Sequence, residues 1–281
     1  MGKNREQYNK GIRMIIIKVG GGESINIEGV CQDLKTLIEK DEKIILVHGA
    51  NNLRDSLAEK LGTKKTTIKS LSGQESVFSD KEMIDLIMMS YSGLRNKIIV
   101  EHCQQKGVNA IGLSGLDARV ISGERNKGIK TEKNGKVILL RDFSGKPKKI
   151  NKKFLSMLLD EGYVPILTIP ILDENGFAIN SENDDIVALL QKEFQAKSII
   201  QLVEAKGFLE NQEDESSLIK NISRHELEKL ETSVSGRMKR KIYSLKKIFQ
   251  STDSKIKVFI SDGRTQNPIL DALNGMGTTI Q

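Results

Sequence analysis

MIIIKVGGGESIN, residues 14 to 26, is the stretch from which the fold of this chain can be predicted. Met14–Val19 is apolar apart from Lys18, which is typical of a strand buried on both faces of a sheet. Three glycines follow at once, and the next segment has the spacing of an amphipathic helix. A buried strand that passes through a glycine turn into a helix indicates a parallel α/β sheet.

The same alternation of strand and helix continues along the chain. Apolar runs predict further strands at Lys43–His48, Val108–Leu113, Tyr163–Ile169, Ser198–Val203 and Lys255–Ile260. Amphipathic patterns predict helices at Asn26–Lys40, Asn51–Leu61, Asp80–Lys106, Lys152–Glu161, Asp184–Ala196, Gly236–Phe249 and Asn267–Leu273. We therefore expect an α/β fold, a three-layer αβα sandwich whose central sheet is mainly parallel and is covered by helices on both faces.

One segment, Val120–Asp142, breaks this rhythm. It carries Asn134-Gly135 between polar and β-branched residues, a pattern that predicts an antiparallel hairpin. Because no repeat, low-complexity tract or Pro/Gly-rich linker divides the chain, we expect a single domain over residues 14–281. Within it, a substrate-side lobe would cover 14–162 and a nucleotide-side lobe 163–281, after a basic arm of residues 1–13.

Composition excludes some classes of protein. The 44 basic and 37 acidic side chains give a net charge of +7, which favours an acidic partner without naming one. Aromatic residues are only 4% and Trp is absent, which argues against a nucleic-acid-binding face. No apolar stretch reaches the roughly 20 residues that span a membrane. Cys31 and Cys103 fit buried free thiols better than a disulfide or a metal site, so we expect a cytoplasmic protein.

Glycines follow the first two strands, where a parallel sheet binds its ligands. Lys18 and the triplet Gly20–Gly22 could form an anion nest, in which successive N–H groups face a phosphate. A flexible turn explains the glycines equally well, and neither a Walker A loop nor a dinucleotide fingerprint is present. The second strand ends in His48-Gly49-Ala50-Asn51. A lone histidine there is more often packed in the core than catalytic.

Five motifs occur in the order and spacing of a known family: KVGGGESIN, ILVHG, NKIIVEHCQQKGVNAIGLSGLDAR, NSENDDIVALL and GRMKRK. Together they resemble the amino acid kinase family. Within that family they are most similar to the N-acetylglutamate kinase branch, and within that branch to the lysine-biosynthesis kinases. Those kinases phosphorylate α-aminoadipate or glutamate while its amino group is attached to LysW, a small acidic carrier protein. The resemblance implies the αβα fold, ATP as phosphate donor, Mg²⁺ held by phosphates and water without a protein ligand, and a homodimer.

The resemblance also implies a role for particular residues. Lys18 and Lys241 match two catalytic lysines, and Asp184 matches the aspartate that organises them. From charge alone, the run that ends at Lys241 could equally be a solvated basic helix face. Asn180 matches a substrate-binding amide. The phosphate- and substrate-binding glycine loops correspond to Gly20, Gly21, Gly22, Gly49 and Ala50, and the nucleotide-binding positions to Glu204, Gly207, Phe208 and Met238.

The chain departs from the family pattern at one telling position. Val77 stands where relatives carry an arginine that clamps the substrate carboxylate, and valine cannot replace a bidentate cation. Either Arg95, Arg119 or Lys69 binds the carboxylate instead, or the substrate differs. Three functions therefore remain open: a kinase for a carrier-bound amino dicarboxylate, an N-acetylglutamate kinase, and a catalytically weak nucleotide-binding regulator. Two lysine clusters could dock an acidic carrier, one at Lys64, Lys65 and Lys69 and one within residues 146–153.

Overall fold

A computed structural model describes residues 13–63, 65–71, 75–133, 135–211, 214–233, 236–250 and 256–281. Nearly all of the basic arm expected at residues 1–13 lies outside these ranges. In the part that is described, no helix combines the length and the apolar character needed to cross a membrane.

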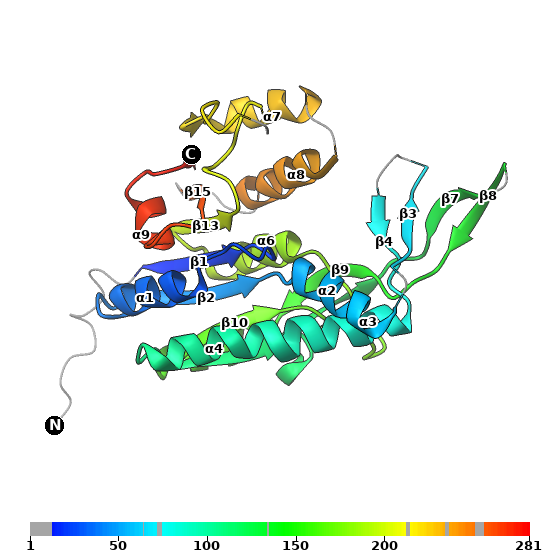
Figure 1. Cartoon of the computed structure of the whole chain (residues 1–281). Helices are drawn as coiled ribbons and strands as arrows, with labels where there is room; N and C mark the ends of the chain where they lie inside the picture. Colours follow the sequence, from blue (N-terminus) through cyan, green and yellow to red (C-terminus); the bar gives the residue numbers. More distant parts are fainter. Residues whose placement is uncertain are drawn as a thin grey trace.

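The core of the molecule is an eight-stranded sheet with the order β14-β16-β15-β13-β1-β2-β10-β5 (Figure 1). Its strands are β1 (Met14–Val19), β2 (Lys43–His48), β5 (Ala110–Ser114), β10 (Val164–Thr168), β13 (Ser198–Val203), β14 (Asn221–Ile222), β15 (Lys257–Asp262) and β16 (Thr278–Ile280). All neighbouring strands are parallel except β15 and β16. This confirms the predicted mainly parallel sheet.

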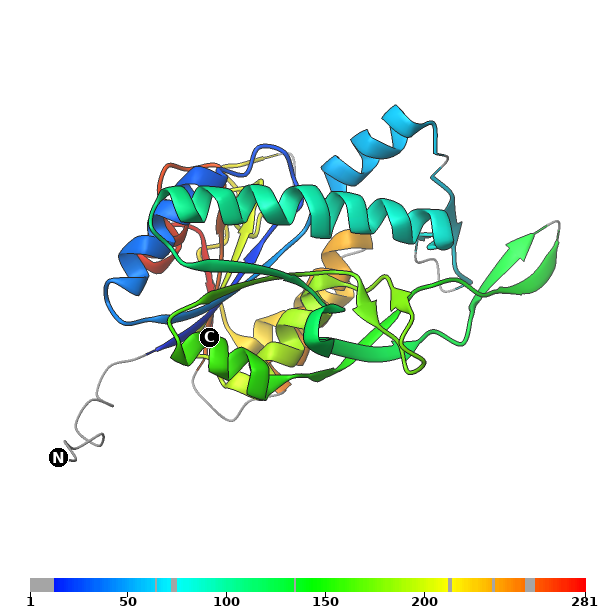
Figure 2. The same cartoon turned by 90° about the horizontal axis from the view of Figure 1, so that it is seen from below.

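Helices cover both faces of the sheet, and the alternation of side chains along β1 explains how. Ile15, Ile17 and Val19 face a core that they share with α1 (Ile27–Ile38), α4 (Asn96–Gln105) and α9 (Pro268–Leu273). Ile16 faces the opposite core. There the sheet is covered by α5 (Lys152–Asp160), α6 (Asn183–Phe194) and α8 (Gly236–Gln250), and α7 (Arg224–Ser233) packs on α8. Figures 1 and 2 show the resulting three layers.

The helix predicted over Asp80–Lys106 is continuous, but its middle is wound differently. It consists of α3 (Lys81–Ile87), a π-helical stretch η1 (Met88–Arg95) and α4, and it crosses the sheet in Figure 2. π-Helical turns inside α-helices are frequent at functional sites because they change the direction in which side chains project. Two side chains of this stretch, those of Tyr91 and Arg95, contact the loops that follow β1 and β2.

The segment Val120–Asp142 differs from the expectation of one hairpin. Its first strand, β6 (Ile121–Arg125), pairs with the distant β9 (Gly145–Ile150) and with β11 (Ile171–Leu172), which pairs with β12 (Ala178–Ile179). Only β7 (Ile129–Lys133) and β8 (Lys136–Leu140) form a hairpin, with Gly135 in its turn. The hairpin is predictable from Asn-Gly, but long-range pairing of β6 is not.

This hairpin lies beside a second one, formed by β3 (Thr67–Lys69) and β4 (Glu75–Val77). The Leu71 N–H donates to the Lys130 carbonyl at 2.9 Å, and the Thr131 hydroxyl donates to the Lys69 carbonyl at 2.8 Å. The two hairpins project together from the body of the molecule in Figure 1. We call them the double-hairpin arm (the described residues 67–71, 75–77, 129–133 and 135–140).

Cys31 on α1 and Cys103 on α4 are both buried and free, with their Sγ atoms 3.2 Å apart. This confirms the expectation of buried thiols. The division into two lobes at residue 162 stays a prediction, and β10, the first strand after that boundary, lies between β2 and β5.

Candidate functional site

Lys18 and Asp184 form an ion pair where β1 ends and α6 begins. Their Nζ and Oδ1 atoms are 2.8 Å apart, and the two side chains are only 16% and 23% exposed. Lys18 lies on the face of β1 that points toward α6, because it follows Ile16 by two residues. Asp184 lies in the first turn of α6, where the helix dipole also favours a negative charge. The ion pair therefore holds the Lys18 side chain at the carboxyl edge of the sheet.

The loop after β1 packs directly against the loop after β2. A Cβ added to Gly21 would lie 2.8 Å from the Ala50 nitrogen and 2.6 Å from the Asn51 nitrogen, so no side chain fits there. The Asn52 N–H also donates to the Gly21 carbonyl at 3.2 Å. The two predicted anion-binding loops therefore form one continuous backbone surface beside Lys18.

The N–H groups of this surface are not all available to a ligand, which corrects part of the sequence expectation. The Gly20 N–H donates to the Leu202 carbonyl at 2.9 Å, and the Gly49 N–H donates to the Val19 carbonyl at 2.9 Å. Both bonds continue the ladders of the central sheet. The N–H groups of Gly21 and Gly22 donate to no acceptor in the described part of the chain, so these two fit a phosphate oxygen best.

His48 is a packed histidine, as the sequence favoured. Its side chain is fully buried, Nε2 accepts from the Asn96 amide at 3.1 Å, and Nδ1 donates to the Gly49 carbonyl at 3.2 Å. These partners assign the proton of a neutral imidazole to Nδ1. Burial lowers the pKa of His48 to about 3. The His48 carbonyl accepts hydrogen bonds from Thr168 and Asn183, which ties this loop to α6.

Glu204, at the end of β13, reaches back to the glycine loop. Its carboxylate accepts from the Ser24 N–H at 2.9 Å and from the Ser24 hydroxyl, and these bonds lower the pKa of Glu204. A Cβ on Gly22 would overlap this carboxylate, so a side chain there would require the Glu204 carboxylate to move. Arg95 approaches from the other side, with Nη2 3.5 Å from the Gly22 carbonyl. Burial lowers the pKa of Arg95, and the Glu204 charge opposes that effect.

Two further residues were expected at the site, Asn180 on the substrate side and Phe208 on the nucleotide side. Asn180 donates through Nδ2 to the Ser79 hydroxyl at 2.9 Å, and its backbone pairs with Phe143 and Gly145. Phe208 is buried in the core, and its N–H donates to the Thr278 hydroxyl at 2.8 Å. Its side chain is therefore a packing element beside Gly207 and does not face the site.

Two predicted residues cannot be placed by side chain. Lys241 and Met238 belong to α8, but the side chains of residues 236–241 lie outside the described part of the structure. Further along α8, Lys247 Nζ is 2.6 Å from Asp185 Oδ1, so an ion pair connects α8 to the residue next to Asp184.

Sequence reasoning missed several of these contacts. Asn183, Ser24 and Tyr91 all position the loops, the last by donating to the Asn51 side chain at 2.6 Å. Asn183 could have been noticed, since it stands beside Asp184 at a helix start. Ser24 and Tyr91 carry no local signal, because their partners are remote in the sequence. Of the three cations considered as substitutes for the missing arginine, Arg95 lies at the glycine loop, while Arg119 and Lys69 are exposed.

A parallel α/β sheet with a lysine–aspartate pair beside a glycine surface at its carboxyl edge is the class of fold and site that suits phosphate binding. The model of the amino acid kinase family matches residues 13–262, and the chain belongs to that family. It is accordingly a kinase, a phosphotransferase that uses ATP.

Relatives and solved structures agree with this assignment. The LysW-aminoadipate kinase of Thermus thermophilus is 38% identical over 95% of this chain and 100% of its own length. The acetylglutamate kinase of Archaeoglobus fulgidus is 28% identical over 95% of this chain and 92% of its own length. The carbamate kinase of Giardia shares the fold, with a TM-score of 0.61 at 16% identity, over 96% of this chain and 98% of that one.

The ion pair at β1 gives a first prediction. Lys18→Ala should lower kcat by about 10²-fold or more, on the scale of losing one preorganised charge donor. Asp184→Ala should do comparable damage, because it acts by holding Lys18. The double variant should then lose little more than Lys18→Ala alone. Steady-state kinetics on the three proteins test this.

The surface pair of Lys43 and Asp160 provides the control, since it is also a lysine–aspartate contact. Lys43→Ala should leave kcat unchanged. Additive losses at Lys18 and Asp184 would contradict a shared role.

Burial of His48 gives a second prediction. Because its folded pKa of about 3 lies below the unfolded value of about 6.5, the unfolded chain binds the extra proton first as the pH falls. The contribution of neutral His48 to the free energy of unfolding is therefore fully present above pH 6.5 and is lost as the pH falls toward 3. Between pH 7 and pH 5 the loss should be about 2 kcal/mol in the free energy of unfolding.

Denaturant titrations of the wild type and of His48→Gln at several pH values measure this loss. The variant is less stable at pH 7 but should lack that part of the acid dependence. Identical acid slopes in the two proteins would show that His48 is not the group responsible.

Proposed function

We propose that the chain transfers the γ-phosphate of ATP to the side-chain carboxylate of an amino dicarboxylate, aminoadipate or glutamate, whose amino group is attached to a LysW-type carrier protein. The observation that carries the proposal is the Lys18–Asp184 ion pair beside the N–H groups of Gly21 and Gly22, which donate to no acceptor among the described residues. The similarity to a LysW-aminoadipate kinase supports the choice of substrate. The products would be ADP and an acyl phosphate.

The residues fit the charges of such a reaction. The carboxylate oxygen attacks the γ-phosphorus while the bond to the ADP oxygen breaks, so negative charge is spread over the phosphoryl oxygens. Lys18, together with the N–H groups of Gly21 and Gly22, would neutralise and orient these oxygens. We assign Lys241 to the ATP side and Asn180 to the amino acid. Mg²⁺ would be held mainly by the phosphates and water, with no protein ligand assigned, and would supply positive charge that neutralises the phosphates. A homodimer and a cytoplasmic location also belong to this proposal.

Arg95 is our candidate for the cation that compensates for Val77. Its guanidinium is largely buried, and its Nε meets no acceptor among the described residues. A buried guanidinium with an open donor is costly unless an anion completes its hydrogen bonds. It lies at the glycine loop, whereas Val77 packs against the hydrophobic core. The substrate anion would therefore be bound from a different direction than in relatives with the arginine.

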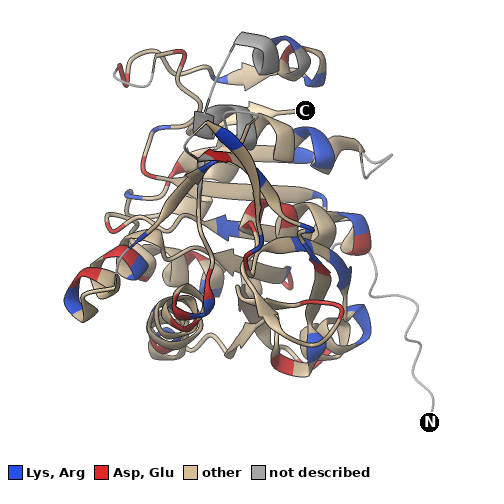
Figure 3. Cartoon of the chain, turned by 90° about the vertical axis from the view of Figure 1, so that its right-hand side faces the viewer, with Lys and Arg blue, Asp and Glu red and all other residues tan. Residues whose placement is uncertain are grey.

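The double-hairpin arm is our candidate for docking the carrier. Leu71, Val137 and Leu139 are more than half exposed on it, which is unusual for large apolar side chains grouped together. Lys69, Lys130 and Lys136 are exposed beside them. Figure 3 looks onto the arm and shows the basic segments along it. An apolar centre with a basic rim suits a small acidic protein.

The proposed basic surface differs from the cluster expected at Lys64, Lys65 and Lys69. Lys65 is paired with Asp55 at 2.8 Å, and Lys64 lies outside the described residues. Lys69 keeps its place in the proposed surface, and Lys130 joins it from the neighbouring hairpin.

Substrate preference gives the third prediction and tests the proposed function. Free N-acetylglutamate should be a poor substrate with a high KM, because position 77 lacks the bidentate clamp and the open donor of Arg95 replaces it only in part. The carrier-bound amino acid should regain kcat/KM through remote protein contacts. Val77→Arg should lower the KM for N-acetylglutamate. Steady-state comparison of both substrates decides the matter.

Two results would count against the proposal. Equal or better kcat/KM on N-acetylglutamate would favour the acetylglutamate kinase alternative. ATP binding without ADP formation on any amino dicarboxylate would favour a regulatory protein. Val77→Leu serves as the control for changes in packing around β4.

Carrier docking gives the fourth prediction. Lys69→Glu/Lys130→Glu should slow carrier association, and the wild-type rate should fall as salt rises, because exposed charges are screened beyond about 8–10 Å. ATP affinity should hardly change. Stopped-flow association at low and high salt measures both effects.

Lys220→Glu/Lys257→Glu provides a control with the same change in net charge, at exposed positions near β14 and β15. An equal loss of rate in this control would mean that net charge alone governs association. A carrier association rate that does not depend on salt would contradict docking of the carrier on the arm.

A further inference from the structure

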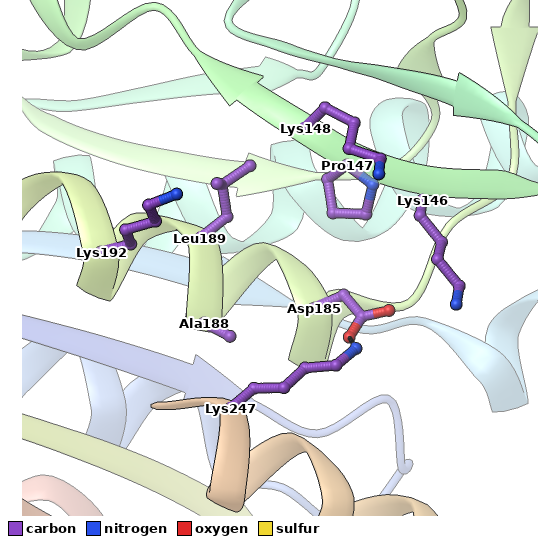
Figure 4. Close-up of a pocket in the computed structure, with 8 residues that line it drawn as sticks. All are labelled: Lys146, Pro147, Lys148, Asp185, Ala188, Leu189, Lys192 and Lys247. Carbon is purple, nitrogen blue, oxygen red and sulfur yellow. Dashed lines mark hydrogen bonds and ion pairs between the residues drawn. The ribbon is translucent and has the colours of Figure 1, made fainter. Parts of the chain in front are cut away.

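A hollow of about 260 Å³ lies between β9, α6 and α8 (Figure 4). It is on the side of the central sheet that α6, the helix of Asp184, covers. None of the residues assigned above to phosphoryl transfer lines it. Its lining residues are Lys146, Pro147 and Lys148 from β9, Asp185, Ala188, Leu189 and Lys192 from α6, and Lys247 from α8.

The rim of the hollow is strongly basic. Four of the eight lining residues are lysines and one is an aspartate, which gives 4 − 1 = +3. Figure 4 shows their amino groups arranged around the hollow from three different elements. Among the lining residues, Lys247 is neutralised by Asp185. Lys148 pairs instead with Glu124, which does not line the hollow, at 3.4 Å between Nζ and Oε2. Lys146 and Lys192 form no ion pair with the side chains that the structure describes.

The floor of the hollow is apolar. Residues 185, 188, 189 and 192 share one face of α6, so two aliphatic side chains, Ala188 and Leu189, lie between an acidic and a basic residue. Lysine ammonium groups that share one hollow repel each other, and a bound anion would relieve that repulsion. The volume is below the range of about 300–1,000 Å³ typical of drug-sized ligands, which favours a small metabolite.

We propose that this hollow binds a small polyanion, a molecule with two or three carboxylate or phosphate groups on a short aliphatic or compact body. Its anionic groups would lie between Lys146 and Lys192, and its body would cover Ala188 and Leu189. Binding of such a ligand does not depend on the substrate proposed above.

A ligand in the hollow would also affect turnover. It would compete with Asp185 for Lys247, whose ion pair joins α6 to α8. Asp185 directly follows Asp184, the partner of Lys18, and α8 carries Lys241. A change in the α6–α8 contact is therefore transmitted to both sides of the phosphoryl-transfer site.

Isothermal titration with citrate and, separately, with inorganic pyrophosphate tests the site on the full-length chain, with saturating ADP present so that the nucleotide site is filled. The wild type should bind one citrate per chain. Lys146→Gln/Lys192→Gln should weaken binding by about tenfold or more, because two cations that face the ligand are lost. Citrate should change the kcat of the wild type and leave that of the double variant unaltered.

Lys149→Gln/Lys153→Gln is the matched control, since it removes the same charge from exposed positions that do not line the hollow. It should bind citrate as the wild type does. An equal loss in both double variants would overturn the proposal in favour of diffuse attraction. Binding that ADP abolishes would place the anion in the nucleotide site, and no binding of either probe at millimolar concentration would overturn the site outright. Should the chain prove inactive on every amino dicarboxylate, the titration still decides the hollow.

Discussion

A lysine ammonium at the carboxyl edge of a buried sheet requires an anion close by, and in this molecule Asp184 supplies it for Lys18. The requirement fixes more than two side chains. Asp184 can reach Lys18 only if α6 begins at the edge of β1, and Asn183 secures that start by donating to the His48 carbonyl at 3.0 Å. If Lys18 neutralises the transferring phosphoryl group as proposed, this ion pair already holds the ammonium at the edge of the sheet, and little reorganisation would be needed during transfer.

The fold could be predicted from the sequence because its main signals are local. The apolar run of Met14–Val19 and its successors can be buried on both faces only in a parallel sheet between helices. The pairing of β6 with β9 could not be predicted. The two strands are about 20 residues apart in the sequence, and the periodicity of a strand does not indicate which other strand it pairs with. The π-helical winding of Met88–Arg95 was hidden for a similar reason: the apolar spacing of the whole helix reads as α-helical, and the wider turns depend on tertiary contacts.

The site was predictable in its positions and less so in its chemistry. Motif spacing placed Lys18, Asp184 and the glycines, and the structure brings them together. Which N–H groups remain for a ligand depends on the sheet ladders, and those engage Gly20 and Gly49. The neutral state of His48 likewise follows from burial and from Asn96, a residue 48 positions away. Sequence pattern therefore identifies the loops, whereas hydrogen-bond accounting assigns the donors.

Two side chains of opposite charge contact the glycine loop around Gly22. Glu204 binds Ser24 on one side of Gly22, and Arg95 reaches the Gly22 carbonyl from the other. Glu204 directly follows β13, and Arg95 is the last residue of the π-helical stretch η1, so both charges reach the loop from segments that are remote in the sequence. An incoming substrate carboxylate would meet an arginine whose Nε has no acceptor among the described residues, while Glu204 is already held by its hydrogen bonds from Ser24. The positive end of this clamp would then bind the proposed substrate anion without the loop being rebuilt, which is the condition for a preorganised anion site.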